Sequence, residues 1–145
     1  MIRGLRQFLA MSRSRQLLLL QALLLVGMIR LGLVTLRFQK VRELIERLAQ
    51  PSPKGRARPA PGAIANAVVQ AAHSIPGATC LPQALATRAF MSRHRYPCEL
   101  RIGVMRNTHG AFEAHAWVVY EGQILIGGPT EHVARFTPLP IDSRI

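Results

Sequence analysis

The sequence predicts a domain of the α+β class, in which helices come first and a small antiparallel sheet follows. Two observations support this expectation. Apolar residues recur at helical spacing until about residue 93, whereas apolar and polar residues alternate from about residue 97 onward. Helices and strands that are segregated along a chain are typical of α+β folds. With 145 residues and a hydrophobic fraction of 49%, the chain can bury the core of one compact domain that carries an appendage.

The first 50 residues are predicted to be a helical segment, and residues 17–29 within it are strongly apolar. Arg13 and Arg15 precede this stretch as in a signal peptide, but Arg30 follows it where a cleavage site would need small residues. An arginine near the middle of a membrane span is costly. We therefore favour a buried or partner-covered helix over a transmembrane one. Peripheral attachment to anionic lipid remains an alternative.

A second helix is expected over residues 39–49, where apolar residues recur on one face until Pro51. Residues 51–62 are rich in proline and basic residues and lack apolar periodicity, so they are predicted to form an exposed linker. The predicted organisation is therefore a helical segment over 1–50, a linker over 51–62 and a folded domain over 63–145.

The formal net charge of +12 is concentrated before residue 63. Residues 1–62 hold 12 of the 19 Lys and Arg residues and 2 of the 7 acidic ones, which leaves +10 there and +2 in the remainder. Such a basic segment suits anionic lipid, an acidic protein or nucleic acid. Base-stacking aromatic residues do not alternate with the arginines, so nucleic acid is ranked lowest and no nucleic-acid partner is expected.

The chain has two cysteines, Cys80 and Cys98, too few for a disulfide framework, and neither stands at metal-ligand spacing from a histidine. We expect a reduced, cytoplasmic setting, no metal and no cofactor. Cys80 follows Thr79, a suitable N-cap, at the start of the second of two helices expected over 63–74 and 80–93. There the unpaired N–H groups and the helix dipole favour the nucleophilic thiolate. The alternative is a buried structural cysteine.

An antiparallel meander is predicted after these helices. Cys98 shares a face of its first strand with apolar residues, so it is predicted to lie in the core. In the second strand, His115 shares a face with Trp117 and stands between two small alanines, which leave room for close approach. The three predicted strands cover residues 97–106, 114–120 and 123–126.

His115 is the candidate general base for Cys80. A base must come within about 3 Å of its nucleophile, and a strand beside the start of the helix can provide this. The alternative is a histidine at the edge of the core whose ring bonds to the backbone. The other histidines lie in dissimilar contexts without ligand spacing and are expected on the surface or in loops: His73, His94, His109 and His132.

These motifs, in this order and at about this separation, resemble the leader peptidases of lasso-peptide biosynthesis, the B proteins of the transglutaminase-like superfamily. The leucine- and arginine-rich front resembles the helical segment that precedes the catalytic part in that family. The pieces that carry the resemblance are Thr79–Ala86, Leu100–Val104, Ala114–Val118, Ile126–Gly128 and Phe136–Leu139.

The resemblance implies that residues 63–145 form a transglutaminase-like cysteine peptidase domain with Cys80 and His115 as catalytic residues. Such proteins cut the leader from a ribosomally made precursor, and an ATP-dependent macrolactam cyclase then closes the freed core. In split systems a separate small protein recognises the leader. No β-rich module precedes the catalytic half here, so the chain resembles the split form. The implied partners are the precursor leader peptide, the recognition protein and the cyclase.

The sequence departs from the family at the third residue of the triad. Some members carry an aspartate where Ile126-Gly127 stand here. The third group could be one of the nearby acids, a backbone carbonyl, or missing, and loss of an orienting group weakens catalysis without abolishing it. Gln83 is a candidate for a second oxyanion donor beside the Cys80 N–H. The nearby acids are Glu121, Glu131 and Asp142.

Two other functions stay open at the level of sequence. An acyl transferase on the same scaffold would use the same residues and differ in whether water reaches the acyl-enzyme. A non-catalytic basic module would act on a membrane through residues 1–62, and its association would be sensitive to salt.

Overall fold

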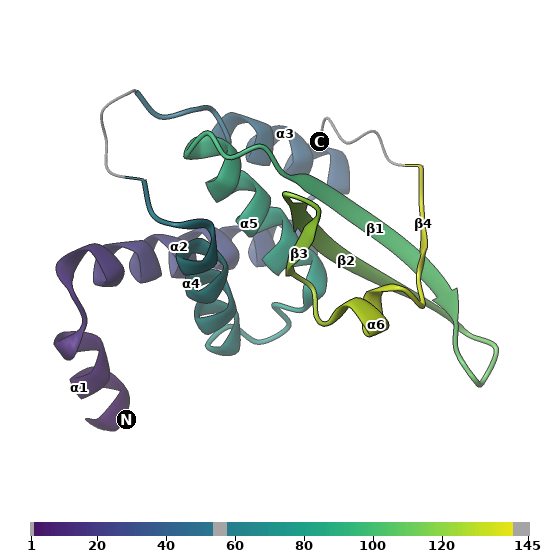
Figure 1. Ribbon diagram of the computed structural model, residues 1–145, viewed down its shortest axis with the longest axis horizontal. Helices are drawn as coiled ribbons and strands as arrows, with labels where there is room; N and C mark the ends of the chain where they lie inside the picture. The colour runs from purple at the N-terminus through teal and green to yellow at the C-terminus, as the bar shows by residue number, and fades with distance from the viewer. Residues whose placement is uncertain (1, 54–57, 141–145) are drawn as a thin grey trace.

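The computed structural model describes residues 2–53 and 58–140, and it confirms the α+β class (Figure 1). Five helices come first, and a four-stranded sheet with one short helix follows. The elements are α1 (Ile2–Ala10), α2 (Arg13–Thr35), α3 (Phe38–Leu48), α4 (Pro61–His73), α5 (Cys80–Arg93), β1 (Glu99–Arg106), β2 (Phe112–Tyr120), β3 (Gln123–Ile126), α6 (Thr130–Val133) and β4 (Thr137–Pro138).

The sheet is antiparallel and has the strand order β3-β2-β1-β4. β1 and β2 pair along their whole lengths, with Gly103 opposite His115. β3 is shorter, and its last residue, Ile126, lies opposite Val118. Among the described residues, the first part of β2, before Val118, therefore has no β3 partner on that side. His115 lies in this part of β2, where Gly127 follows the end of β3.

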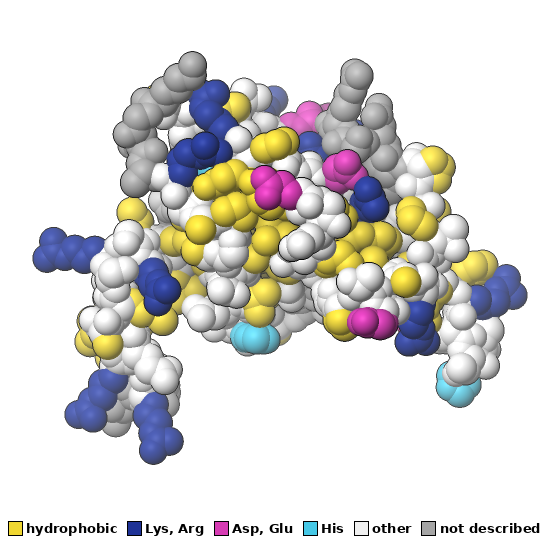
Figure 2. Space-filling model, in the orientation of Figure 1, with side chains coloured by type: hydrophobic (Ala, Val, Ile, Leu, Met, Phe, Trp, Pro, Cys, Tyr) yellow, Lys and Arg dark blue, Asp and Glu magenta, His cyan; other side chains and the backbone are white. Residues whose placement is uncertain are grey.

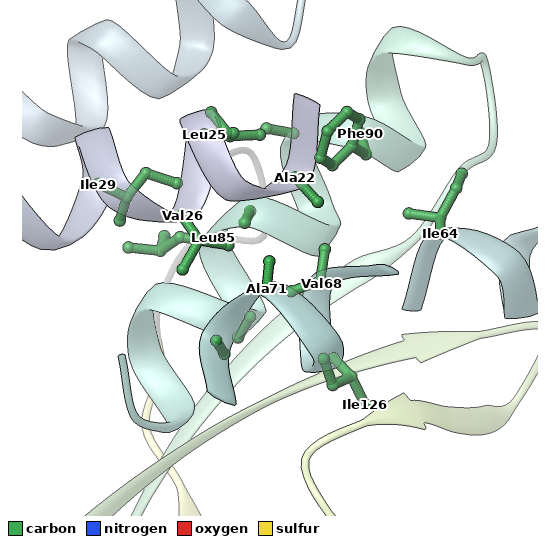
Figure 3. Close-up of a cluster of buried hydrophobic side chains, with 14 of the residues drawn as sticks. Ala22, Leu25, Val26, Ile29, Ile64, Val68, Ala71, Leu85, Phe90 and Ile126 are labelled. Atoms are coloured by element: carbon green, nitrogen blue, oxygen red, sulfur yellow. The ribbon is translucent and has the colours of Figure 1, made fainter. Parts of the chain in front are cut away.

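One hydrophobic core joins α2, α4 and α5 to one face of the sheet. Figure 3 shows Val26 and Ile29 of α2 beside Leu85 of α5, with Ile126 of β3 below them. Alanines at the helix contacts let the backbones approach closely, and the apolar area removed from water stabilises the arrangement by roughly 25 cal/mol per Å². The buried alanines of this core include Ala22, Ala71, Ala84 and Ala86.

Most predicted elements are confirmed. The helices expected over 39–49, 63–74 and 80–93 correspond to α3, α4 and α5, and each observed start lies within two residues of the expected one. The three strands of the meander correspond to β1, β2 and β3. The sequence did not predict α6 or β4, because four-residue and two-residue elements are too short to display a hydrophobic period.

The expected boundary between a helical segment and a folded domain crosses the core. α2 belongs to the segment predicted over 1–50, yet it packs directly on α4 and α5. The predicted linker is partly fixed: Arg58 Nε donates to the His94 carbonyl at 2.8 Å, and its guanidinium lies 4.1 Å from the centre of the Tyr96 ring. Pro61 already begins α4, and residues 54–57 lie outside the described part.

Candidate functional site

Cys80 is the first residue of α5 and is half-buried. Thr79 takes the N-cap position in an extended conformation, but its hydroxyl makes no capping hydrogen bond. The N–H groups of the first turn therefore lack a side-chain acceptor at Thr79. A helix start in this condition stabilises a negative charge that develops beside it, such as an oxyanion.

The turn that leads into Cys80 is held by a side chain from α2. Arg30 Nε donates to the Pro76 carbonyl at 3.3 Å, and its guanidinium lies against Gly77. Gly77 has φ +76°, and a β-carbon there would collide with that guanidinium. The arginine that interrupts the apolar sequence of α2 thus positions the α4–α5 turn, so a substitution of Arg30 acts on the position of Cys80.

Gln83 closes the same turn from the other side. Its Nε2 donates to the Ala78 carbonyl at 2.9 Å, and its backbone N–H bonds to the Thr79 carbonyl at 3.3 Å. The side-chain amide therefore serves the loop before the helix. The expected role of Gln83 as an oxyanion donor has no support in this geometry, because the hydrogen bond points toward Ala78.

His115 lies on β2, and its ring has a backbone partner. The distance between His115 Nε2 and the Gly127 carbonyl oxygen is 2.6 Å. Because a carbonyl oxygen only accepts, Nε2 carries the proton in this arrangement, and Nδ1 of the neutral ring is left with its lone pair. The ring therefore bonds to a backbone carbonyl, which is one of the alternatives named from the sequence for the third group, and the identity of that third group stays a prediction.

The Gly127 carbonyl reaches the ring because this residue is a glycine. Its φ of +121° lies in a region that L side chains rarely adopt, and a β-carbon at this position would collide with the backbone and side chain of Trp117. The acids named as possible third residues are placed elsewhere. Glu121 and Glu131 are exposed and make no hydrogen bond to His115 among the described residues, and Asp142 lies outside them.

The His115 ring belongs to a small aromatic cluster that the sequence did not predict. It stacks on Phe136 with the ring centres 5.0 Å apart and meets the edge of His132 at 4.9 Å. Trp117 lies on the same face, with its ring centre 6.1 Å away. His132 is exposed, as expected, but α6 brings it beside His115. No periodic signal in the sequence marks this contact.

Cys80 and His115 belong to α5 and β2, two elements that contact each other. α5, which begins at Cys80, packs on the face that carries Ala116 and Val118, whereas the His115 ring lies with Trp117 on the other face. No hydrogen bond joins Cys80 to His115 among residues 2–53 and 58–140. α5 contacts both β2 and β3. The pairing of sulfur with imidazole therefore stays a prediction.

A hollow of about 790 Å³ lies on the face of the sheet that carries His115. Trp117 and Phe136, which surround the imidazole, also line this hollow. Val119 and Ile124 add apolar wall, and Arg101 stands at its border paired with Glu99 at 2.7 Å.

The other candidate residues are structural or exposed. Cys98 packs against the main core, as predicted, and burial raises the pKa of its thiol to about 11, opposed by the nearby Arg88. His73 and His109 are exposed, and His94 is partly buried with a lowered pKa, chiefly because burial disfavours its charged form. The described residues contain no cluster of His, Cys, Asp and Glu that could hold a metal ion.

Comparison with known families places the chain. A family model, the transglutaminase-like superfamily, matches residues 23–140, which include the second half of α2 and both candidate catalytic residues. The chain therefore belongs to the transglutaminase-like superfamily, which includes cysteine peptidases and acyltransferases. Comparisons with curated proteins and with solved structures gave no match.

Proposed function

We propose that this protein is a cysteine peptidase that removes the leader from a ribosomally made lasso-peptide precursor. It acts in the cytoplasm with a separate leader-recognition protein and with the ATP-dependent macrolactam cyclase that closes the product. The observation that carries the proposal is the superfamily match over 23–140, which covers a cysteine at a helix start and a histidine on a strand that contacts that helix.

The reaction uses the two side chains as nucleophile and base. His115 takes the proton of Cys80, and the thiolate attacks the scissile carbonyl carbon to form a C–S bond. The Cys80 backbone N–H stabilises the oxyanion. The C–N bond then breaks, and the imidazolium protonates the leaving amine. Water attacks the thioester with His115 as base, which releases the leader carboxylate and restores the thiol.

The proposal requires one rearrangement of the resting site. Sγ of Cys80 must come within hydrogen-bond distance of Nδ1 of His115, while Nε2 keeps the Gly127 carbonyl as its partner. The Cα–Cβ bond of a strand residue keeps its side chain on one face of the sheet, so this approach involves a movement of the turn at Cys80 relative to β2.

The decisive experiment is cleavage of the cognate lasso-peptide precursor in the presence of its recognition protein. Cys80→Ala and His115→Ala should each lower the cleavage rate by at least about a thousandfold, since members of a catalytic unit are each required. Cys98→Ala is the matched control and should cleave normally, because its thiol is packed against the core. If Cys80→Ala or His115→Ala cleaves the precursor at the wild-type rate, the mechanism is wrong.

Acyl transfer is the second candidate, because superfamily membership supports both reactions. The same acyl-enzyme would then react with an amine in place of water. Adding hydroxylamine or an amine peptide during turnover separates the two. If the protein is a transferase, amide products accumulate and the yield of free leader carboxylate falls, even when the amine is present at only millimolar concentration.

A further inference from the structure

The outward face of α2 is apolar along almost its whole length. Leu24 and Leu31 have 65% and 64% of their surfaces exposed, and further large apolar side chains continue this face at helical spacing. Gln21 is the one exposed polar residue between Leu17 and Leu31 on the described helix. The other exposed members of this surface, called here the α2 stripe, are Leu17, Leu20, Met28 and Val34.

The opposite face of α2 is buried in the protein interior. Ala22, Val26 and Ile29 lie in the core that joins α4 and α5. A helix that is apolar on every side is normally covered on every side. α2 is long and apolar enough to cross a membrane by length and composition, but a third of that stretch is buried inside the protein. If α2 crossed a membrane, its contacts with the core would be lost. Whatever covers the stripe must therefore leave α2 packed on α4 and α5.

α1 extends this surface away from the body (Figure 1). It is nine residues long, and Leu5 and Leu9 are exposed on it. A hydrogen bond from Gln16 Nε2 to the Phe8 carbonyl, 2.7 Å long, ties it to α2. A helix this short is marginal in water. An amphipathic helix of this kind gains stability when its apolar side enters a lipid interface.

The part of the chain that carries the stripe is strongly basic. Residues 1–42 contain eight Lys and Arg residues and no Asp or Glu. Arg13 and Arg15 are exposed at the start of α2, and Arg37 and Lys40 are exposed just beyond its end, so cations flank the stripe at both ends. Figure 2 shows the basic side chains of the α1 region projecting at the lower left. Each basic residue near an anionic membrane surface adds to the attraction.

We propose that α1 and the α2 stripe form a docking surface for the anionic face of a lipid bilayer. α2 lies in the plane of the interface, with its leucines among the acyl chains and the flanking arginines among the headgroups. The part of the protein that holds α4, α5 and the sheet faces away from the lipid. An acidic protein could match the charge, but it would not need an apolar stripe that extends along the whole helix.

The test is co-sedimentation of the full-length protein with vesicles. Vesicles of phosphatidylcholine with about 30% phosphatidylglycerol should retain the protein, pure phosphatidylcholine vesicles should retain much less, and salt should weaken the binding. The double variant Leu24→Ser/Leu31→Ser should bind at least tenfold more weakly. Phe112→Ser is the matched control, because Phe112 is 72% exposed on the distant β1–β2 hairpin. Circular dichroism shows that each variant is folded.

Three results would overturn the proposal. They are failure of the wild type to bind anionic vesicles, equal binding by the folded double variant, and a wild-type dimer in solution that the double variant dissociates. The last result would assign the stripe to a second copy of the chain. None of these readouts depends on peptide cleavage, so the membrane surface and the proposed peptidase stand or fall separately.

Discussion

At the scale of single residues, three positions make contacts that the local sequence pattern did not specify. Arg30 was the residue that argued against a membrane span, and the structure uses its guanidinium to hold the turn before Cys80. His132 had no motif, yet its ring contacts His115. Gly127 provides the carbonyl that bonds the imidazole. Each contact joins segments that are far apart in the chain or separated by an unpredictable turn.

Gly127→Ala should be among the most damaging single substitutions near the site. The new β-carbon meets Trp117 and forces an unfavourable φ, so we expect the free energy of unfolding to fall by at least about 2 kcal/mol. Gly122→Ala is the control, because Gly122 also has a positive φ but has open space around it. Urea titration measures the free energy of unfolding of both variants.

In the wild type, ¹⁵N NMR should find the His115 proton on Nε2, and a proton on Nδ1 would contradict the hydrogen bond to Gly127.

Cys98 should behave as a poorly reactive thiol. Its pKa of about 11 exceeds the ordinary 9.0, so at pH 8 it is almost entirely protonated. The thiolate fraction is then about a hundredfold lower than that of an ordinary thiol and rises tenfold per pH unit until about pH 11. Alkylation of the Cys80→Ala variant by iodoacetamide, followed by mass spectrometry, tests this. A rate equal to that of a free cysteine at pH 8 would disagree with burial of Cys98.

At the scale of elements, the long predictions succeeded because each is supported by several periods of the hydrophobic pattern. α5 and the β1–β2 pair were placed almost to the residue. α2 was predicted to be buried or covered by a partner, and one of its faces is indeed in the core. The two sides of this helix are nearly identical in composition, so the sequence could not tell which one faces the protein.

A pair of substitutions in α2 separates these two sides. Ile29→Ala should lower the free energy of unfolding by about 3 kcal/mol, since Ile29 is 3% exposed and truncation leaves a cavity among α4 and α5. Leu31→Ala removes a similar side chain that is exposed to solvent, and it should change stability by less than about 0.5 kcal/mol. Chemical denaturation in detergent-free buffer provides the comparison. If both variants lose the same free energy of unfolding, α2 does not pack on the core through the face that carries Ile29.

At the scale of the whole molecule, the structure combines what the sequence divided. The expected division at residues 51–62 followed from composition, but α2 lies in the same core as α4 and α5, and the superfamily match begins at residue 23. A proline-rich stretch marks a change in local structure. It does not show whether the elements on either side pack together, because packing depends on contacts between distant residues.

The sequence by itself determined the fold class, the order of the elements, the basic front and the two candidate catalytic residues, because local periodicity and side-chain chemistry are written along the chain. The tertiary structure decided the partner of the His115 imidazole, the use of Arg30 and the side of α2 that remains outside. These features depend on how helices and strands are oriented in three dimensions, and that orientation results from the packing of the whole core.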